Sequence, residues 1–342
     1  MDGDLWTLYR QMLRSRLFEE VVRLLWEEGR ISGELHMSIG EEGIVAGVLA
    51  HLRDGDAMAL DHRGTSPMII RGVDPVLLLR ELLGLADGLC AGQGGHMHLY
   101  SREFLAASSG IVGASGPAAA GFALAAQMLR PEAVAVAFFG EGAMNQGMLM
   151  ESMNLAVSWN LPLIFVCKDN QWSISTVSED VTAGGLDRRA RGFGMPVVRV
   201  DGTEAAAVWR ATEKLIDNAR SGLGPAFIHA SCARPDGHML GDLMLKTARR
   251  EAVPDVSPLL RSALGRGNSI RGRWESIAAI SSMLKQADEE HTIEGNDPLQ
   301  ISRQKLTMNL PRLRVLEQEV IDEMQQVVAT SLQPTADERS LP

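Results

Sequence analysis

Two short apolar runs with a helical segment between them constrain the fold of this chain more than any other feature. Residues 133–139 (AVAVAFF) and 161–167 (LPLIFVC) are apolar throughout, as expected of strands that are buried on both faces of a parallel sheet. Residues 145–159 carry apolar side chains at close to helical spacing. This order of strand, helix and strand predicts an α/β fold with a doubly wound, mainly parallel sheet.

Polar groups follow each of these strands where it ends. Gly140, Glu141 and Gly142 come after the first strand, and Asn170 lies just beyond the second. We therefore expect Glu141 and Asn170 on adjacent strand ends, where ligands of such sheets bind. A carboxylate, an amide oxygen and a backbone carbonyl suit Mg²⁺, which commonly takes phosphate oxygens and water as its other ligands. The alternative is a turn acid and a strand-end asparagine in an ordinary doubly wound domain.

The combined pattern resembles the thiamine-diphosphate signature, in which Gly-Asp/Glu-Gly is followed after a fixed interval by paired asparagines. Residues 140–147 (GEGAMNQG) and 161–176 (LPLIFVCKDNQWSIST) are also similar to the α subunit of the 2-oxo acid dehydrogenases. That family includes the pyruvate, branched-chain and acetoin enzymes. The resemblance implies a sheet of the thiamine-diphosphate-binding type, with thiamine diphosphate and Mg²⁺ as cofactors.

The resemblance also implies which residues hold these cofactors. The side chains of Glu141 and Asn170 would bind Mg²⁺, with the backbone carbonyl of Trp172 as a third metal ligand. Glycines at this turn would let the backbone approach a ligand closely. The other residues expected to line the cofactor here are Gly140, Gly142 and Ala143.

Two segments nearer the N-terminus resemble parts of the family's cofactor pocket. His36 follows an expected opening helix and matches a cofactor-pocket histidine, which also makes it a catalytic candidate by resemblance. His62 and Arg63 lie at the end of an expected strand and match a pair that holds the diphosphate. A guanidinium suits phosphate because it offers a planar fork of donors and stays charged. The alternatives are a structural role for His36 and a surface position for Arg63.

A glycine-rich loop at residues 92–100 (GQGGHMHLY) resembles another segment of the family, with His96 in place of its usual serine. The pair His96 and His98 could also suggest metal binding. No third ligand of matching spacing is evident, so we reject a zinc site. Residues 110–113 (GIVG) match the segment that touches the aminopyrimidine ring, and this resemblance gives Gly110 and Val112 as cofactor contacts.

The last expected active-site residue follows a predicted strand at residues 225–232. Residues 236–242 (DGHMLGD) resemble the family's active-site loop, and their Gly-His-x-x-Gly-Asp form is closest to the acetoin enzymes. By this resemblance His238 contacts the cofactor and is catalytic, stabilising charge on the bound substrate or intermediate. The alternative is an ordinary loop histidine. Thr65 departs from the family, because many relatives carry a further histidine there.

The resemblance implies a reaction and partners for it. The chain would be the α subunit of an oxidoreductase that cleaves a small 2-oxo acid or acetoin and transfers the acyl group to a lipoyl-bearing acyltransferase. In this family the acid that activates the aminopyrimidine comes from a β subunit, which predicts an α2β2 heterotetramer and an inactive α chain on its own. The alternatives are a split transketolase-like or acyloin-forming carboligase subunit and a non-catalytic scaffold paralogue.

Composition argues against several other classes of protein. The net charge of -10 argues against a nucleic acid or a phospholipid surface as the main partner. Three cysteines without the spacing of a disulfide framework indicate a reducing compartment. No apolar run is long enough to span a bilayer, and the start MDGDLW does not resemble a signal peptide. We therefore expect a cytoplasmic protein with no membrane segment.

The expected organisation is one α/β domain with helical extensions at both ends. The thiamine-diphosphate domain would span residues 1–250 and include the N-terminal helical segment. Residues 251–296 would form an insertion or mobile segment, and residues 297–342 a helical tail. Within that tail, residues 311–332 carry a helical apolar stripe, which predicts packing along the body or on a partner.

Two further helices are expected within the domain. Thr203 has the side chain of an N-cap and would open a helix that runs to about residue 220. Residues 116–129 carry small side chains four positions apart, which allow another helix to approach closely, either inside this chain or across a subunit interface. The small residues are Gly116 with Ala120 and Gly121 with Ala125.

Overall fold

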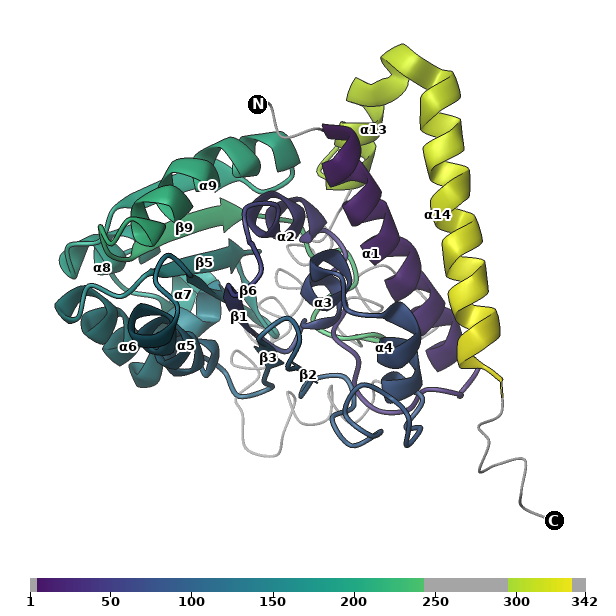
Figure 1. Ribbon diagram of the computed structural model, residues 1–342, viewed down its shortest axis with the longest axis horizontal. Helices are drawn as coiled ribbons and strands as arrows, with labels where there is room; N and C mark the ends of the chain where they lie inside the picture. The colour runs from purple at the N-terminus through teal and green to yellow at the C-terminus, as the bar shows by residue number, and fades with distance from the viewer. Residues whose placement is uncertain (1–4, 243–294, 334–342) are drawn as a thin grey trace, which may run out of the picture.

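A seven-stranded sheet lies at the centre of the computed structural model, which describes residues 5–242 and 295–333 (Figure 1). Its strand order is β2-β3-β1-β4-β5-β9-β8, and each neighbouring pair is parallel except β2 with β3. Strands β6 and β7 form a separate antiparallel pair. The bounds are β1 Ala57–Leu60, β2 Tyr100–Ser101, β3 Ala106–Ser108, β4 Ala135–Gly140, β5 Leu163–Asp169, β6 Trp172–Ser173, β7 Thr176–Val177, β8 Val197–Asp201 and β9 Ala226–Ser231.

Helices cover both faces of this sheet (Figure 1). Helices α1, α2 and α9 contribute to the core on one face, and α5, α6 and α8 contribute to the core on the other. The described helices are α1 Leu5–Glu27, α2 Glu42–Leu49, α3 Thr65–Arg71, α4 Pro75–Leu82, α5 Ser115–Leu129, η1 Glu141–Asn145, α6 Gly147–Ser158, α7 Ser178–Val181, α8 Leu186–Gly192, α9 Ala205–Arg220, α13 Pro298–Leu306, η2 Thr307–Asn309 and α14 Leu310–Ser331.

The two cores follow from the alternation of side chains along each strand. In β4, Val136 and Phe138 join the core with α1, α2 and α9, whereas Ala137 and Phe139 join the core with α5, α6 and α8. Because both faces are covered, neighbouring positions along the strand are equally apolar. The predicted doubly wound α/β fold is confirmed.

The two strands that opened the sequence argument are neighbours in the sheet. Strands β4 and β5 pair in parallel, with Phe139 beside Cys167 and Gly140 beside Lys168. Their carboxyl ends therefore lie side by side, and the helix between them, α6, crosses over one face. The expected adjacency of the two polar strand ends is confirmed.

One helix start was predicted wrongly. Helix α9 begins at Ala205, and its N-cap position is Glu204 rather than Thr203. Thr203 donates both its backbone N–H and its hydroxyl to the Asp201 carboxylate, at 2.9 and 2.7 Å. The acid two residues upstream therefore engages the polar groups of Thr203, which does not cap the helix.

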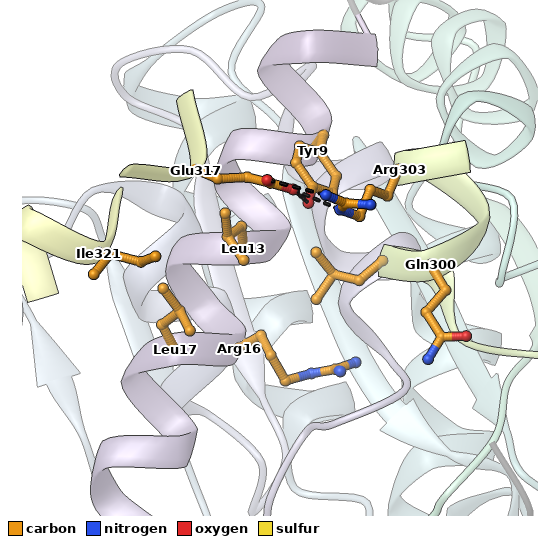
Figure 2. Close-up of a pocket in the computed structure, with 9 residues that line it drawn as sticks. Tyr9, Leu13, Arg16, Leu17, Gln300, Arg303, Glu317 and Ile321 are labelled. Atoms are coloured by element: carbon orange, nitrogen blue, oxygen red, sulfur yellow. Dashed lines mark hydrogen bonds and ion pairs between the residues drawn. The ribbon is translucent and has the colours of Figure 1, made fainter. Parts of the chain in front are cut away.

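The C-terminal helices pack back onto the N-terminal helix. Helix α14 runs alongside α1, and Pro311 lies in its first turn after the N-cap Asn309 (Figure 1). Figure 2 shows Tyr9 of α1, Arg303 of α13 and Glu317 of α14 meeting beside an apolar groove. The Tyr9 hydroxyl and the Arg303 guanidinium donate to Glu317 at 2.8 and 2.7 Å. The helix predicted at residues 311–332 therefore packs along the body of the chain.

The insertion predicted at residues 251–296 lies almost entirely outside the described residues, which resume at Gly295. Among the described residues, no helix combines the length and the apolar character needed to cross a membrane.

The small residues of α5 divide between two surfaces. Gly116 and Ala120 are buried, and a Cβ atom added to Gly116 would lie 2.7 Å from Cδ1 of Leu149 in α6. This pair therefore permits close packing inside the chain. Gly121 and Ala125 are exposed, so the second pair lies on an outer surface of α5.

A buried carboxyl group joins α1 to residues 38 and 65. Glu19 accepts hydrogen bonds from the Ser38 backbone N–H at 2.7 Å and from the Thr65 hydroxyl at 2.6 Å. Thr65 therefore directs its hydroxyl to Glu19 of α1. Burial raises the pKa of Glu19 to about 8.

We expect Glu19 to make the folded chain less stable as the pH rises. Between about pH 5 and about pH 8 the unfolded chain loses this proton while the folded chain retains it, so the free energy of unfolding falls. The loss should reach at least about 1.4 kcal/mol, the equivalent of one pKa unit. Glu19→Gln keeps an acceptor for Ser38 and should flatten this pH dependence in denaturant titrations. An unchanged pH dependence in the variant would contradict the assignment.

Candidate active site

All twelve site residues expected from the sequence line one pocket of about 460 Å³ at the carboxyl ends of β1, β4 and β5. They come from six separate segments of the chain, which the sheet topology brings together. These residues are His36, His62, Arg63, Gly110, Val112, Gly140, Glu141, Gly142, Ala143, Asn170, Trp172 and His238.

The expected metal ligands lie on facing strand ends. The buried Glu141 carboxylate accepts hydrogen bonds from the Asn170 backbone N–H at 3.3 Å and from the Ser178 hydroxyl at 2.6 Å. The Asn170 side-chain oxygen accepts from the Trp172 N–H at 3.1 Å. Burial raises the pKa of Glu141 to about 7. A cation at this position would stabilise the buried carboxylate.

The Trp172 carbonyl has a partner that the sequence argument missed. Arg234 donates to the carbonyl oxygens of Trp172 and Ile174 at 3.3 and 3.0 Å, and it also lines the pocket. Burial first, and then the charge of Arg63, lower the pKa of Arg234 to about 10. The guanidinium therefore fixes the backbone that follows Asn170.

Some polar atoms of the pocket are buried without a hydrogen-bond partner among the described residues. They include His36 Nδ1, His62 Nε2 and Ser173 Oγ. Gly142 lies against the Ser173 hydroxyl, because a Cβ atom at position 142 would be 2.1 Å from Ser173 Oγ. Unpaired buried polar atoms are costly unless a ligand or water satisfies them. The pocket is therefore suited to a polar, oxygen-rich ligand together with a divalent cation.

Three histidines from distant segments meet in this pocket. Ligand-type nitrogens of His36, His62 and His238 lie within 4.8 Å of one another. Burial is the main cause that lowers the pKa of His36 to about 4 and of His238 to about 3, and it also lowers the pKa of His62. All three rings are therefore neutral near pH 7, and each can donate one hydrogen bond and accept another.

The histidine pair considered for zinc is arranged differently. His96 is buried with Nε2 2.8 Å from the His36 backbone nitrogen, and His98 is exposed. The search for a third ligand by spacing alone did not find the His36, His62 and His238 group, because these residues lie in three loops. Only the folded chain brings them together.

Arg63 is buried, so its alternative interpretation as a surface arginine was wrong. Its guanidinium donates to the Met37 carbonyl and, at 3.0 Å, to the His238 carbonyl. It therefore joins the loop that carries His36 to the loop that carries His238. The two histidine loops are positioned by the same side chain.

An ion-pair network that the sequence analysis missed includes two acids of the pocket lining, Glu41 and Asp61. Lys168 at the end of β5 is buried, and its Nζ lies 2.6 Å from Glu41 and 3.0 Å from Asp61. These two acids raise the pKa of Lys168 above its usual value despite burial, which acts to lower it. Glu41 also lies 3.6 Å from Arg63. A lysine directly before Asp169 was the only local signal, and its partners are distant in the sequence.

Lys168→Met should destabilise the chain by about 3 kcal/mol, because it removes the cation shared by the buried Glu41 and the half-buried Asp61 and leaves Glu41 only the more distant Arg63. Denaturant titration monitored by circular dichroism measures this loss. The matched control is Lys305→Met, which removes a partly exposed ion pair with Glu204 and should cost less than about 1 kcal/mol. Equal costs for the two variants would contradict the proposed importance of the buried network.

Comparison with known proteins gives an independent view of the same region. A sequence model of the family described as the dehydrogenase E1 component matches residues 9–257. The α subunit of acetoin:2,6-dichlorophenolindophenol oxidoreductase from Cupriavidus necator is 42% identical over 247 residues, 72% of this chain and 74% of the relative. The Bacillus subtilis protein of that name is 40% identical over 73% of this chain and 75% of its own length. The pyruvate dehydrogenase E1 component α subunit of Zymomonas mobilis is 36% identical over 74% and 72%.

Proposed function

Because the chain belongs to the dehydrogenase E1 component family, we propose that it is the α subunit of a thiamine-diphosphate-dependent acetoin or 2-oxo acid dehydrogenase. It acts in the cleavage of a small acyloin or 2-oxo acid, and the acyl group passes to a lipoyl-bearing acyltransferase. The single observation that carries this proposal is the meeting of all twelve expected residues in one pocket.

The residues of the pocket fit a diphosphate with a divalent cation. Glu141 and Asn170 hold Mg²⁺, with the Trp172 carbonyl as the third protein ligand. Oxygen ligands of this kind are those that Mg²⁺ prefers. The buried carboxylate of Glu141, whose pKa is raised, is the observation that favours a cation here.

The histidines and Arg63 form the other wall of the pocket. His36, His62 and Arg63 bind the diphosphate, for which the unpaired ring nitrogens of His36 and His62 supply hydrogen bonds. Gly110 and Val112 pack against the aminopyrimidine ring. Bound thiamine diphosphate supplies the carbanion chemistry. His238 orients the substrate and, as a neutral imidazole, donates or accepts one proton at its carbonyl or hydroxyl oxygen.

A β subunit completes this site. At the pocket lining, Ile111, Val112 and Ile174 are 62%, 52% and 58% exposed. Large apolar side chains exposed together favour coverage by a partner. The β subunit supplies the acid that activates the aminopyrimidine, and the assembly is an α2β2 heterotetramer. Cys167 within β5 is buried, and Cys90 and Cys232 are half-buried; all three are free thiols, which suits the reducing cytoplasm that we propose as the protein's location.

The substrate is a small acyloin or 2-oxo acid. The relatives with 42% and 40% identity are named for acetoin, and the relative with 36% identity is named for pyruvate. The Gly-His-x-x-Gly-Asp loop around His238 favours acetoin. Such substrates differ by about one small group, which a pocket distinguishes by only about 1–3 kcal/mol.

Glu141→Gln should weaken magnesium-dependent binding of thiamine diphosphate at least about 100-fold, which corresponds to about 2.7 kcal/mol. The reason is the loss of the charged metal ligand. Isothermal titration calorimetry on the chain co-purified with its β partner measures this effect. Glu179→Gln is the matched control, because this exposed acid lies in α7 near the same pocket and should leave binding unchanged. Tight binding by the Glu141 variant would contradict the proposed metal site.

The purified chain alone should not turn over acetoin or pyruvate, because the activating acid belongs to the partner. Reduction of 2,6-dichlorophenolindophenol measures turnover without the acyltransferase. We expect activity when the β subunit is added and a rate at the background level without it. Full activity of the α chain alone would refute the proposed division of the site.

A further inference from the structure

Residues 170–185, the long loop between β5 and α8 that includes the short elements β6, β7 and α7, supply one side of the pocket. Asn170, Trp172, Ser173 and Ile174 of this loop all line the pocket, and Ser178 donates to the Glu141 carboxylate. Whatever fixes the two ends of the loop therefore also fixes these groups.

His229 of β9 contacts one residue on each side of this loop, Asp169 at the end of β5 and Asp187 in α8. Its Nε2 lies 2.7 Å from Oδ2 of Asp169, the residue directly before the loop, and its Nδ1 lies 2.6 Å from Oδ1 of Asp187 in the first turn of α8. The side chain is only 11% exposed. A neutral imidazole has a single N–H, so donation to both carboxylates requires the imidazolium.

The charges around His229 agree with this protonation state. Asp169 and Asp187 face the ring from β5 and α8, and Asp201 of β8 lines the same small pocket. Arg199 of β8 pairs with the second oxygen of Asp187. Burial acts to lower the pKa of His229, but its hydrogen bonds to the two carboxylates together raise it above the usual value.

Asp169 connects His229 to the turn that carries the proposed metal ligands. Its second carboxylate oxygen accepts the backbone N–H of Gln171 at 2.9 Å. Gln171 has a φ of 68°, in the left-handed region that side chains other than glycine adopt only with support. The turn through Gln171 determines where the Asn170 side chain and the Trp172 carbonyl lie.

We propose that His229 is a positioning residue that, as an imidazolium, ties both ends of the loop at residues 170–185 to the sheet and so orders the metal-binding side of the cofactor site. The part of this proposal that concerns the cofactor rests on the proposed function. The part that concerns the loop stands on the contacts of His229 alone.

Asp187→Asn tests whether His229 must be charged, because the variant can keep the contacts of residue 187 with His229 and Arg199. The introduced amide can donate its N–H to His229 Nδ1 and accept from Arg199 through its oxygen. A neutral imidazole then satisfies both sides, because its Nε2–H still donates to Asp169. The variant should keep the loop ordered after His229 loses its proton, whereas the unmodified chain should not.

Hydrogen exchange of the peptide covering residues 170–185 tests this difference in the chain co-purified with its β partner. His229 contributes order below its unfolded pKa, near 6.5, and this contribution is lost as the pH rises through its higher folded value. From about pH 6 to about pH 9, protection corrected for intrinsic exchange should fall at least about tenfold in the unmodified chain. The fall should be much smaller in Asp187→Asn, where Glu141, the acceptor for Asn170 and Ser178, still titrates in this range. Protection should be low at both pH values in His229→Ala.

A parallel titration with thiamine diphosphate and Mg²⁺ separates the role of His229 in the loop from the proposed binding of the cofactor. At about pH 6, His229→Ala should bind at least about tenfold more weakly, and Asp187→Asn should match the unmodified chain. Identical pH dependence of exchange in the unmodified chain and Asp187→Asn would overturn the proposal, as would unchanged protection in His229→Ala. If the exchange pattern is as expected but no protein binds the cofactor, the loop role of His229 stands and the proposed function fails.

Discussion

Burial of the sheet on both faces is the constraint on which the site depends. Strands such as β4 and β5 have no solvated face on which a polar side chain can lie, so polar residues gather where the strands end. Parallel pairing then aligns the ends of β1, β4 and β5 at one edge. Glu141 and Asn170 meet because of this register. The loops after β1 and β9 bring His62 and His238 to the same edge, and the segment between α1 and α2 brings His36.

Desolvation sets the electrostatics of the pocket. It raises the pKa of Glu141 and lowers the pKa values of His36 and His238, so the site holds an acid that favours a cation and rings that are neutral. The buried charge of Lys168 is paired, because its ammonium group contacts Glu41 and Asp61 of the pocket lining. The protein therefore confines charge to positions where a partner is already in place.

Local patterns in the sequence predicted the sheet and the adjacency of Glu141 and Asn170 well, because strands, glycine turns and strand-end acids are encoded by neighbouring residues. They did not predict the meeting of three histidines from loops far apart, or the burial of Lys168, whose partners lie in other segments. Thr203 was misjudged for a related reason, since Asp201 competed for its hydroxyl. Contacts between distant segments depend on how the loops cross the edge of the sheet, and local sequence patterns do not predict these paths.

The most direct test of this account is the position of the metal in the assembled enzyme. Crystals of the chain with its β partner, grown with thiamine diphosphate and Mn²⁺ in place of Mg²⁺, would give an anomalous signal for an ion with similar oxygen preferences. We predict a peak between the side chains of Glu141 and Asn170. A peak among His36, His62 and His238 instead, or a bound cofactor with no metal beside Glu141, would contradict the account.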